Sequence, residues 1–295
     1  MTSVSPKILV PIGFSEKSLI ALQQATNLAK AMRGELILLS VFEESGTLRK
    51  FFKDNEQQFQ LLKKSMKLDL EDISKEVVAN AVPTTMVIRK GKVYEEIVAA
   101  ADELSASFIF MGTDGKPGQS IKKHIGSNTY RVMTSAHCPV ITIKGSVHRE
   151  GCKIIVLPLD LMKETKEKVG HACKLAKLFG AEIHVISVLD TSDAFKKNKL
   201  TRNLKQVERF IAKEKQLPVV AKTIKPMKGV SVSETIVKYA HDNNADLITI
   251  MTQQEDYLTR HFLGSAAQEI VFTSATPVMS IRPKPKKDTA VFDLP

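Results

Sequence analysis

The chain contains one segment twice, in the same order and nearly the same register, and this repeat constrains its fold more than any other feature. The two copies read Ile8-Leu-Val-Pro11, Leu28-Ala-Lys30 and Glu35-Leu-Ile-Leu-Leu-Ser-Val41, then Ile154-Ile-Val-Leu-Pro158, Leu175-Ala-Lys177 and Glu182-Ile-His-Val-Ile-Ser-Val188. Both copies also end alike, with Gly126-Ser127 and Pro139-Val140 matched by Gly264-Ser265 and Pro277-Val278. At 295 residues, each copy is long enough for its own core, so the repeat predicts two domains of one kind.

Within each copy, short β-branched runs alternate with longer periodic segments, which is typical of an α/β fold with a doubly wound parallel sheet. In the first copy the pattern predicts strands at 7–11, 35–41, 83–89, 108–112 and 140–144, and helices at 16–32, 55–80, 94–104 and 127–135. In the second it predicts strands at 153–157, 182–188, 219–224, 247–251 and 278–282. We therefore expect domains at 1–146 and 151–284, followed by a flexible tail at 285–295 rich in Pro and Lys.

The formal net charge of +11 makes nucleic acid a partner to consider, because Lys and Arg neutralise phosphates. In stretches such as residues 63–72, however, the bases alternate with acids as on a solvated helix face. Aromatic residues make up 6% of the chain and Trp is absent, which leaves few platforms for base stacking. The composition therefore argues against a nucleic-acid partner.

The amino-terminal residues lack the layout of a signal peptide, and no apolar run is long enough to span a bilayer. We expect a cytoplasmic protein without a membrane partner. The three cysteines, Cys138, Cys152 and Cys173, have no metal-ligand spacing and are interpreted as buried or inert thiols. The seven histidines are scattered and are interpreted as surface or turn residues.

A glycine-rich loop follows the fourth predicted strand of the first copy. It begins at Met111-Gly112-Thr-Asp-Gly115 and ends at Gly126-Ser127-Asn128, where a helix is expected to begin. Ligands of open parallel sheets bind beyond the carboxyl ends of the strands, and glycines with a helix N-terminus suit phosphate. The alternative is an ordinary turn in which Ser127 caps the helix.

The whole pattern resembles the universal stress protein family, whose ATP-binding members carry Gly-x-x-Gly, nine residues and Gly-Ser or Gly-Thr after a strand ending in Met-Gly. The opening Ile-Leu-Val-Pro11 and the closing Cys138-Pro-Val-Ile also fit, so the resemblance covers both halves. It implies an adenine nucleotide alpha hydrolase-like fold and an adenine nucleotide, ATP or a relative with or without magnesium. Its site would include Pro11, Gly13, Val41, Met111, Gly112, Gly115, Gly126, Ser127 and Asn128, with Val41 against the adenine and Ser127 and Asn128 donating to phosphates.

Three departures from the family's pattern bear on this expectation. Ten residues rather than nine separate Gly115 from Gly126, and Gly13 stands where nucleotide-binding members have an Asp after the first-strand proline. The second copy has that acid, Asp160, but its fourth-strand loop reads Met251-Thr-Gln-Gln-Glu-Asp256 without glycine. We therefore expect the second copy not to bind ATP and to act as a structural partner of the first.

Asp114 and Asp160 could serve as an acid and a base, but they lie in different copies, and no nucleophile with a spaced general base accompanies either of them. The sequence thus predicts a regulatory or scaffolding switch rather than an enzyme. A slow ATPase or nucleotidyl transferase and a nucleotide-free interaction module remain the alternatives. By resemblance, the last strands at 140–144 and 278–282 pair within the chain as a pseudo-dimer, and a further homodimer is left open.

Overall fold

The computed structural model describes residues 5–43, 56–79, 81–113, 126–145, 150–160, 165–252 and 264–283. The strands are β1 (Lys7–Pro11), β2 (Glu35–Phe42), β3 (Thr84–Lys90), β4 (Phe108–Gly112), β5 (Val140–Ile143), β6 (Ile154–Leu159), β7 (Glu182–Val188), β8 (Val219–Ile224), β9 (Leu247–Met251) and β10 (Val278–Ile281). The helices are α1 (Glu16–Met32), α3 (Glu56–Ala79), α4 (Val93–Glu103), α5 (Ser127–Ser135), α6 (Thr165–Phe179), α7 (Ala194–Arg209), α8 (Val232–Asp242) and α9 (Ser265–Thr273). A π-helical turn, η1 (Phe210–Glu214), extends α7.

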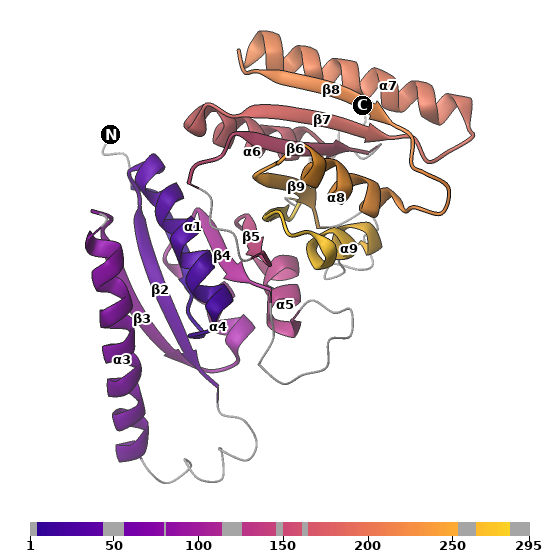
Figure 1. Ribbon diagram of the computed structural model, residues 1–295. Coiled ribbons are helices and arrows are strands. Elements are labelled where there is room, and N and C mark those ends of the chain that lie inside the picture. The colour runs from indigo at the N-terminus through magenta and orange to yellow at the C-terminus, as the bar shows by residue number, and fades with distance from the viewer. Residues whose placement is uncertain are drawn as a thin grey trace, which may run out of the picture.

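All ten strands form one sheet in the order β3-β2-β1-β4-β5-β10-β9-β6-β7-β8. Neighbours within each half are parallel, whereas β5 and β10 pair antiparallel across the halves. The two halves thus continue one another's sheet, as Figure 1 shows. The predicted fold and the predicted pairing of the last strands are both confirmed.

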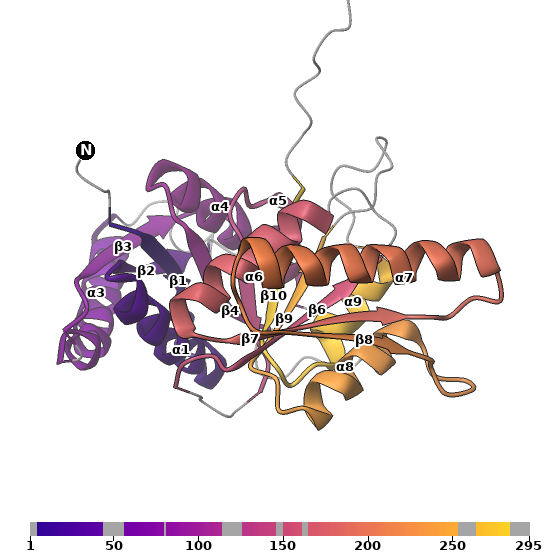
Figure 2. The same ribbon diagram turned by 90° about the horizontal axis from the view of Figure 1, so that it is seen from above.

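Helices cover both faces of the sheet. One core contains buried residues of α1, α3, α6 and α7, and the other contains those of α4, α5, α8 and α9. Each face is therefore covered by two helices from each half, and the halves lie side by side (Figure 2). None of the described helices combines the length and apolarity that crossing a membrane requires.

The junction of the halves, here called the seam, consists of β5, β10 and the cations that follow them. Met279 lies opposite Ile141, and both side chains are buried. Just after β5, Lys144 donates to the carbonyl of Phe272 near the end of α9 and lies 4.2 Å from that ring's centroid. Just after β10, Arg282 Nη1 donates to the Ser135 carbonyl at the end of α5, over 2.8 Å. Each half thus places a cation at the negative end of the other half's last helix.

The Arg282 bond predicts a measurable contribution of the seam to stability. Replacing Arg282 with Met keeps the apolar stem but removes a charged donor, so the free energy of unfolding should fall by about 1 to 3 kcal/mol. Arg202→Met, at an exposed position of α7, should change it by less than about 0.5 kcal/mol. Urea unfolding of both variants checks this, and equal effects would contradict a role for the bond.

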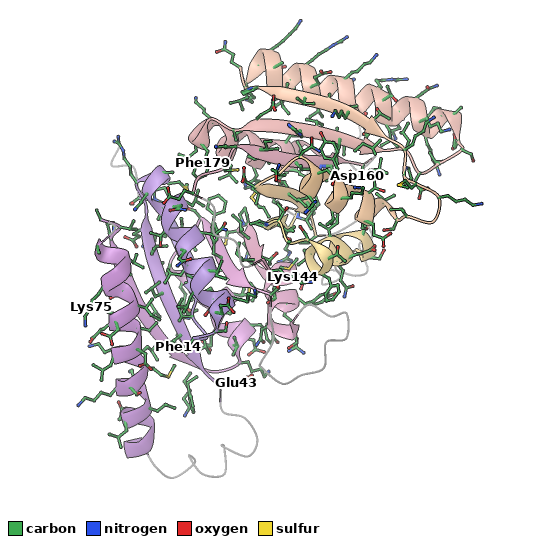
Figure 3. All side chains as sticks on the ribbon, in the orientation of Figure 1. Phe14, Glu43, Lys75, Lys144, Asp160 and Phe179 are labelled. Carbon is green, nitrogen blue, oxygen red and sulfur yellow. The ribbon has the colours of Figure 1, made fainter. Side chains whose placement is uncertain are left out.

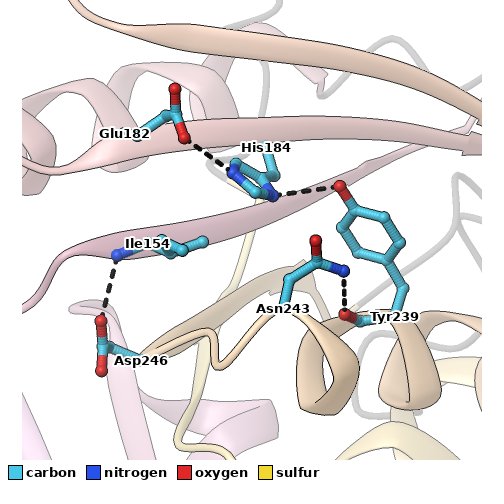
Figure 4. A network of polar contacts seen from close by, with 6 residues as sticks. All are labelled: Ile154, Glu182, His184, Tyr239, Asn243 and Asp246. Carbon is cyan, nitrogen blue, oxygen red and sulfur yellow. Dashed lines mark hydrogen bonds and ion pairs between the residues drawn. The ribbon is translucent and has the colours of Figure 1, made fainter.

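The interpretation of the histidines as surface or turn residues is wrong for His184, which is buried. His184 in β7 is 6% exposed and lies between Glu182 and Tyr239, with contacts of 2.9 Å and 3.0 Å to their oxygens (Figure 4). In the same region, Asp246 accepts hydrogen bonds from the backbone N–H groups of Lys153 and Ile154. These contacts anchor α8 and the start of β9 to strands β6 and β7.

The cysteines are free thiols. Burial raises the pKa of both Cys138 and Cys152 to about 12, so these thiols stay protonated at neutral pH. Cys152 also lines a hollow between the halves on the α1 and α6 face, together with Leu28, Phe110 and Phe179. Figure 3 labels Phe179 at this place.

Candidate functional site

The strand order places a topological switch point in the first half. β1 lies between β2 and β4, and the chain leaves β1 for α1 on one face but leaves β4 for α5 on the other. Ligands of such sheets bind at the carboxyl ends of the two strands. We call this place the switch-point edge and define it as residues 11–15, 112–113 and 126–129.

At the end of β1, the backbone turns sharply into α1. The Ile12 N–H donates to the Leu39 carbonyl over 2.8 Å, and Ser15 caps α1 by accepting from the Ser18 N–H. Phe14 has φ of 55° and 43% exposure, which is an uncommon conformation for a bulky side chain. A Cβ atom added at Gly13 would meet nothing within 4 Å. There is therefore open space beside the position that carries Asp in the family's pattern; Figure 3 labels the neighbouring Phe14.

At the end of β4, Gly112 has a packing function in addition to its predicted place in the phosphate loop. A Cβ atom there would lie 2.7 Å from the Cβ of Lys17 and 3.1 Å from its carbonyl carbon. The glycine thus allows the first turn of α1 to approach β4 closely.

Two hydrogen bonds fix the beginning of α5 against the end of β4. Thr129 Oγ1 donates to the Gly112 carbonyl over 3.2 Å, and the Gly126 N–H donates to the Thr113 carbonyl. The Thr113 N–H in turn donates to the carbonyl of Ile143 at the end of β5. No side chain caps α5 at its N-cap residue, Gly126. The first N–H groups of a helix have no partner within it, so α5 begins at the switch-point edge with N–H groups that no side chain of its N-cap residue satisfies.

The structure brings most of the predicted site residues to this edge. Ser127 is exposed and Asn128 half-buried in the first turn of α5, whereas Gly115 and Asp114 lie outside the described residues. Pro11 pairs with Leu39 in the sheet, so half-buried Val41 extends past the end of β1. Met111 is 6% exposed and packs in the core under α4 and α5, so its side chain faces the core.

Sequence reasoning missed Thr129 and Lys17. Thr129 is 4% exposed and joins α5 to β4, and its equivalent in the second half is Ala267, which has no hydroxyl. In the sequence, the only sign of this role is that a Thr stands two residues after Ser127. Lys17 could not be identified at all, because its closeness to Gly112 depends on how α1 packs.

The second half fills the equivalent place with its own side chains. Met251 is the last residue of β9, as Gly112 is of β4, so a long side chain stands where the first half has none. Lys168 of α6 is 3% exposed, and its Nζ donates to the Pro158 carbonyl over 2.6 Å and lies 3.9 Å from Asp160. The first half has Ala21 at the position of Lys168.

Burial lowers the pKa of Lys168, although Asp160 opposes this effect. Between the lowered folded-state pKa and the unfolded value of about 10.4, the unfolded chain binds more protons, so stability rises with pH. We therefore expect the stability of the wild type relative to Lys168→Met to increase from neutral pH toward about pH 10. Urea unfolding of both chains at several pH values checks this; a pH-independent difference would contradict it.

Comparison with known proteins agrees with this architecture. The profile of the Universal stress protein family matches residues 5–144 and again residues 151–282. A universal stress protein of Methanocaldococcus jannaschii is 32% identical over 163 residues, covering 50% of this chain and 92% of that protein. A second one from the same organism is 29% identical over 160 residues, covering 49% of this chain and 98% of that protein.

Among solved structures, a universal stress protein from Archaeoglobus fulgidus has the same fold over both halves. Its TM-score is 0.75 at 22% identity, covering 95% of this chain and 97% of that one. The family profile accounts for nearly the whole chain. The protein therefore belongs to the universal stress protein family, with two copies of the family's domain in one chain.

Proposed function

We propose that the first half binds one adenine nucleotide at the switch-point edge and that its occupancy regulates the protein. The observation that carries this proposal is the uncapped start of α5, held at the end of β4 by Thr129 and Gly126 and next to the open space at Gly13. Free N–H groups and the positive end of a helix favour phosphate.

The two faces of the edge fit the two ends of a nucleotide. Val41, a half-buried apolar side chain at the end of β2, would lie against the base, and Ser127 and Asn128 would donate to the phosphates. Gly115 would complete the phosphate loop. Magnesium, where present, would be carried by the phosphate oxygens. In the second half, Met251 and buried Lys168 argue against an equivalent ligand.

We favour a regulatory role over catalysis because the three buried hydroxyls around this edge donate to backbone carbonyls. Thr129 donates to Gly112, Thr113 to Ile143 and Ser40 to Ile12. None of these contacts pairs a hydroxyl with a histidine or carboxylate that would activate it. A slow ATPase is the second candidate, and steady phosphate release above that of a Gly112→Val chain would support it instead.

Native mass spectrometry of gently purified protein, followed by calorimetric titration with ATP, ADP and AMP, tests the proposal. We expect one nucleotide per chain. Absence of bound mass together with absence of titration heat would overturn the proposal and leave a nucleotide-free interaction protein.

Gly13→Asp should strengthen nucleotide binding. Its side chain would enter open space, and the backbone φ of Gly13 is not positive, so the substitution carries no strain of that kind. A carboxylate that accepts a hydrogen bond from a ribose hydroxyl contributes about 1 kcal/mol to the binding free energy, which is roughly fivefold in affinity. Calorimetry should show this gain for Asp and none for Gly13→Ala, which controls for backbone stiffening. Equal affinities of the Asp and Ala variants would contradict the prediction.

A further inference from the structure

The positive charge of the chain is concentrated in one segment of the second half. Residues 194–228, which comprise α7, η1, β8 and the start of the following loop, contain eleven Lys and Arg against two Glu. Their net charge of +9 is most of the formal +11 of the whole chain. The expectation that bases are interleaved with acids is therefore wrong for this segment.

Helix α7 presents its cations on the side opposite the core. Leu200 and Leu204 are buried. Along the helix, exposed residues recur at spacings of three or four and form a row: Phe195, Lys199, Arg202, Lys205 and Arg209. These fourteen steps of helix correspond to about 21 Å at 1.5 Å per residue. We call this set the α7 row.

The charges of the α7 row have no acidic partners among the described residues. The ion pairs found there include none from this helix, and the one acid of α7, Glu208, is followed directly by Arg209. In the first half, α3 holds the same place in the chain, between the second and third strands. There Lys67 pairs with Glu71 and Lys75 with Asp72, so the two copies differ in this respect.

We propose that the α7 row binds the phosphodiester backbone of a single-stranded nucleic acid. The line of unpaired cations from Lys199 to Arg209, about 15 Å long at 1.5 Å per residue, matches a line of phosphates, and binding would release the counterions of both. Phe195, 75% exposed at one end of the row, offers a face for stacking a base. The π-helical turn η1, which extends α7, continues the positive surface with exposed Lys213.

An anionic membrane fits these observations less well. A helix that lies in a bilayer surface buries an apolar face among the lipids. The apolar face of α7 is already covered, because Leu200 and Leu204 are buried against the sheet. Only Phe195 of the α7 row could enter the lipid.

The test compares two triple variants that remove the same charge from equivalent helices. Lys199→Gln, Arg202→Gln and Arg209→Gln remove three of the four charges of the α7 row. The control variant has Lys63→Gln, Lys64→Gln and Lys67→Gln at exposed positions of α3. Glutamine is a good helix former, so both chains should keep their circular dichroism spectra and melting curves. The probes are fluorescent single-stranded RNA, single-stranded DNA and duplex DNA, titrated between about 50 and 200 mM salt.

For the wild type, we expect steeply salt-dependent binding of a single strand. Comparing its affinities for single-stranded RNA and single-stranded DNA shows which of the two is preferred. The α7 variant should reduce the steepness of log affinity against log salt by about 2, because each phosphate contact with a single strand contributes about 0.7. The α3 variant should retain the wild-type slope. ATP titration heats should be the same in all three chains, because the row lies apart from the switch-point edge. Equal loss in both triple variants, no binding of any strand, or binding of phosphatidylglycerol vesicles alone would overturn the proposal.

Discussion

A Gly112→Val chain should bind adenine nucleotide about 10- to 100-fold more weakly than the wild type. The new Cβ would lie 2.7 Å from Lys17 Cβ, so either the first turn of α1 or the end of β4 must move. Overpacking of this kind lowers stability by about 1 to 3 kcal/mol. Here the groups that would be displaced, the first turn of α1 and the end of β4, form the two sides of the switch-point edge. Because Thr129 bonds the Gly112 carbonyl, the start of α5 would move with β4. Calorimetric titration with ATP measures the effect.

Gly34→Val is the matched control. A Cβ at Gly34 would collide with the Pro6 carbonyl oxygen, but this contact lies just before β2, at the opposite edge of the sheet. We expect similar losses of unfolding free energy in the two variants and a loss of affinity only in Gly112→Val. If both variants lose affinity in proportion to their stability, the nucleotide site does not depend on Gly112.

The sheet and its helices were predictable from the sequence because hydrophobic periodicity and turn residues act locally. Strands β1, β4, β7, β8 and β9 and helices α1 and α5 have the predicted bounds, and the remaining strands and the predicted helices of the first half differ by one or two residues at their ends. The repeat added long-range information, since two copies of one domain implied equivalent last strands. The π-helical turn η1 was not predicted, because no local pattern in the sequence marks it.

The residues of the candidate site were predictable only where their role depends on the position of the backbone. Gly13 follows a predicted strand, Gly112 ends one and Gly126 precedes a predicted helix, so their place at one edge followed from the fold. Lys168 and Thr129 were missed because their importance depends on the direction of a side chain. Buried Lys168 looks in the sequence like any surface lysine of an amphipathic helix.

The domain boundaries at 146 and 151 and the tail at 285–295 stay predictions, since residues 146–149 and 284–295 lie outside the described residues. The two copies nevertheless differ in a consistent way. The first keeps glycine and open space at its carboxyl edge, and the second fills that edge with Met251 and Lys168 and carries the α7 row. What the two copies share is the use of the last strand, because β5 of the first half and β10 of the second half pair with each other.

The first half alone, residues 1–149, should therefore form a dimer. All four residues of β5 are buried in the whole chain, with exposures of 1% to 4%, and removing the second half exposes them on a free strand edge. A free apolar edge readily pairs with another strand, and a second copy of β5 could take the antiparallel place of β10. Curated relatives are covered to 92% and 98% of their length by about half of this chain, so one copy is enough for a protein of this family.

Light scattering after size-exclusion chromatography measures this assembly, with Ile141→Lys in the same half as the matched control. Ile141 faces Met279 in the whole chain, and a charge there should keep the half monomeric because the dimer would have to bury it unpaired. Hydrogen exchange should show that the β5 amides directed away from β4 are protected in the dimer and unprotected in the Ile141→Lys monomer, while those bonded to β4 are protected in both. A wild-type half that is folded and monomeric would contradict the prediction. It would mean that β5 is stable as a free edge and that covering this strand is not the role of the second copy.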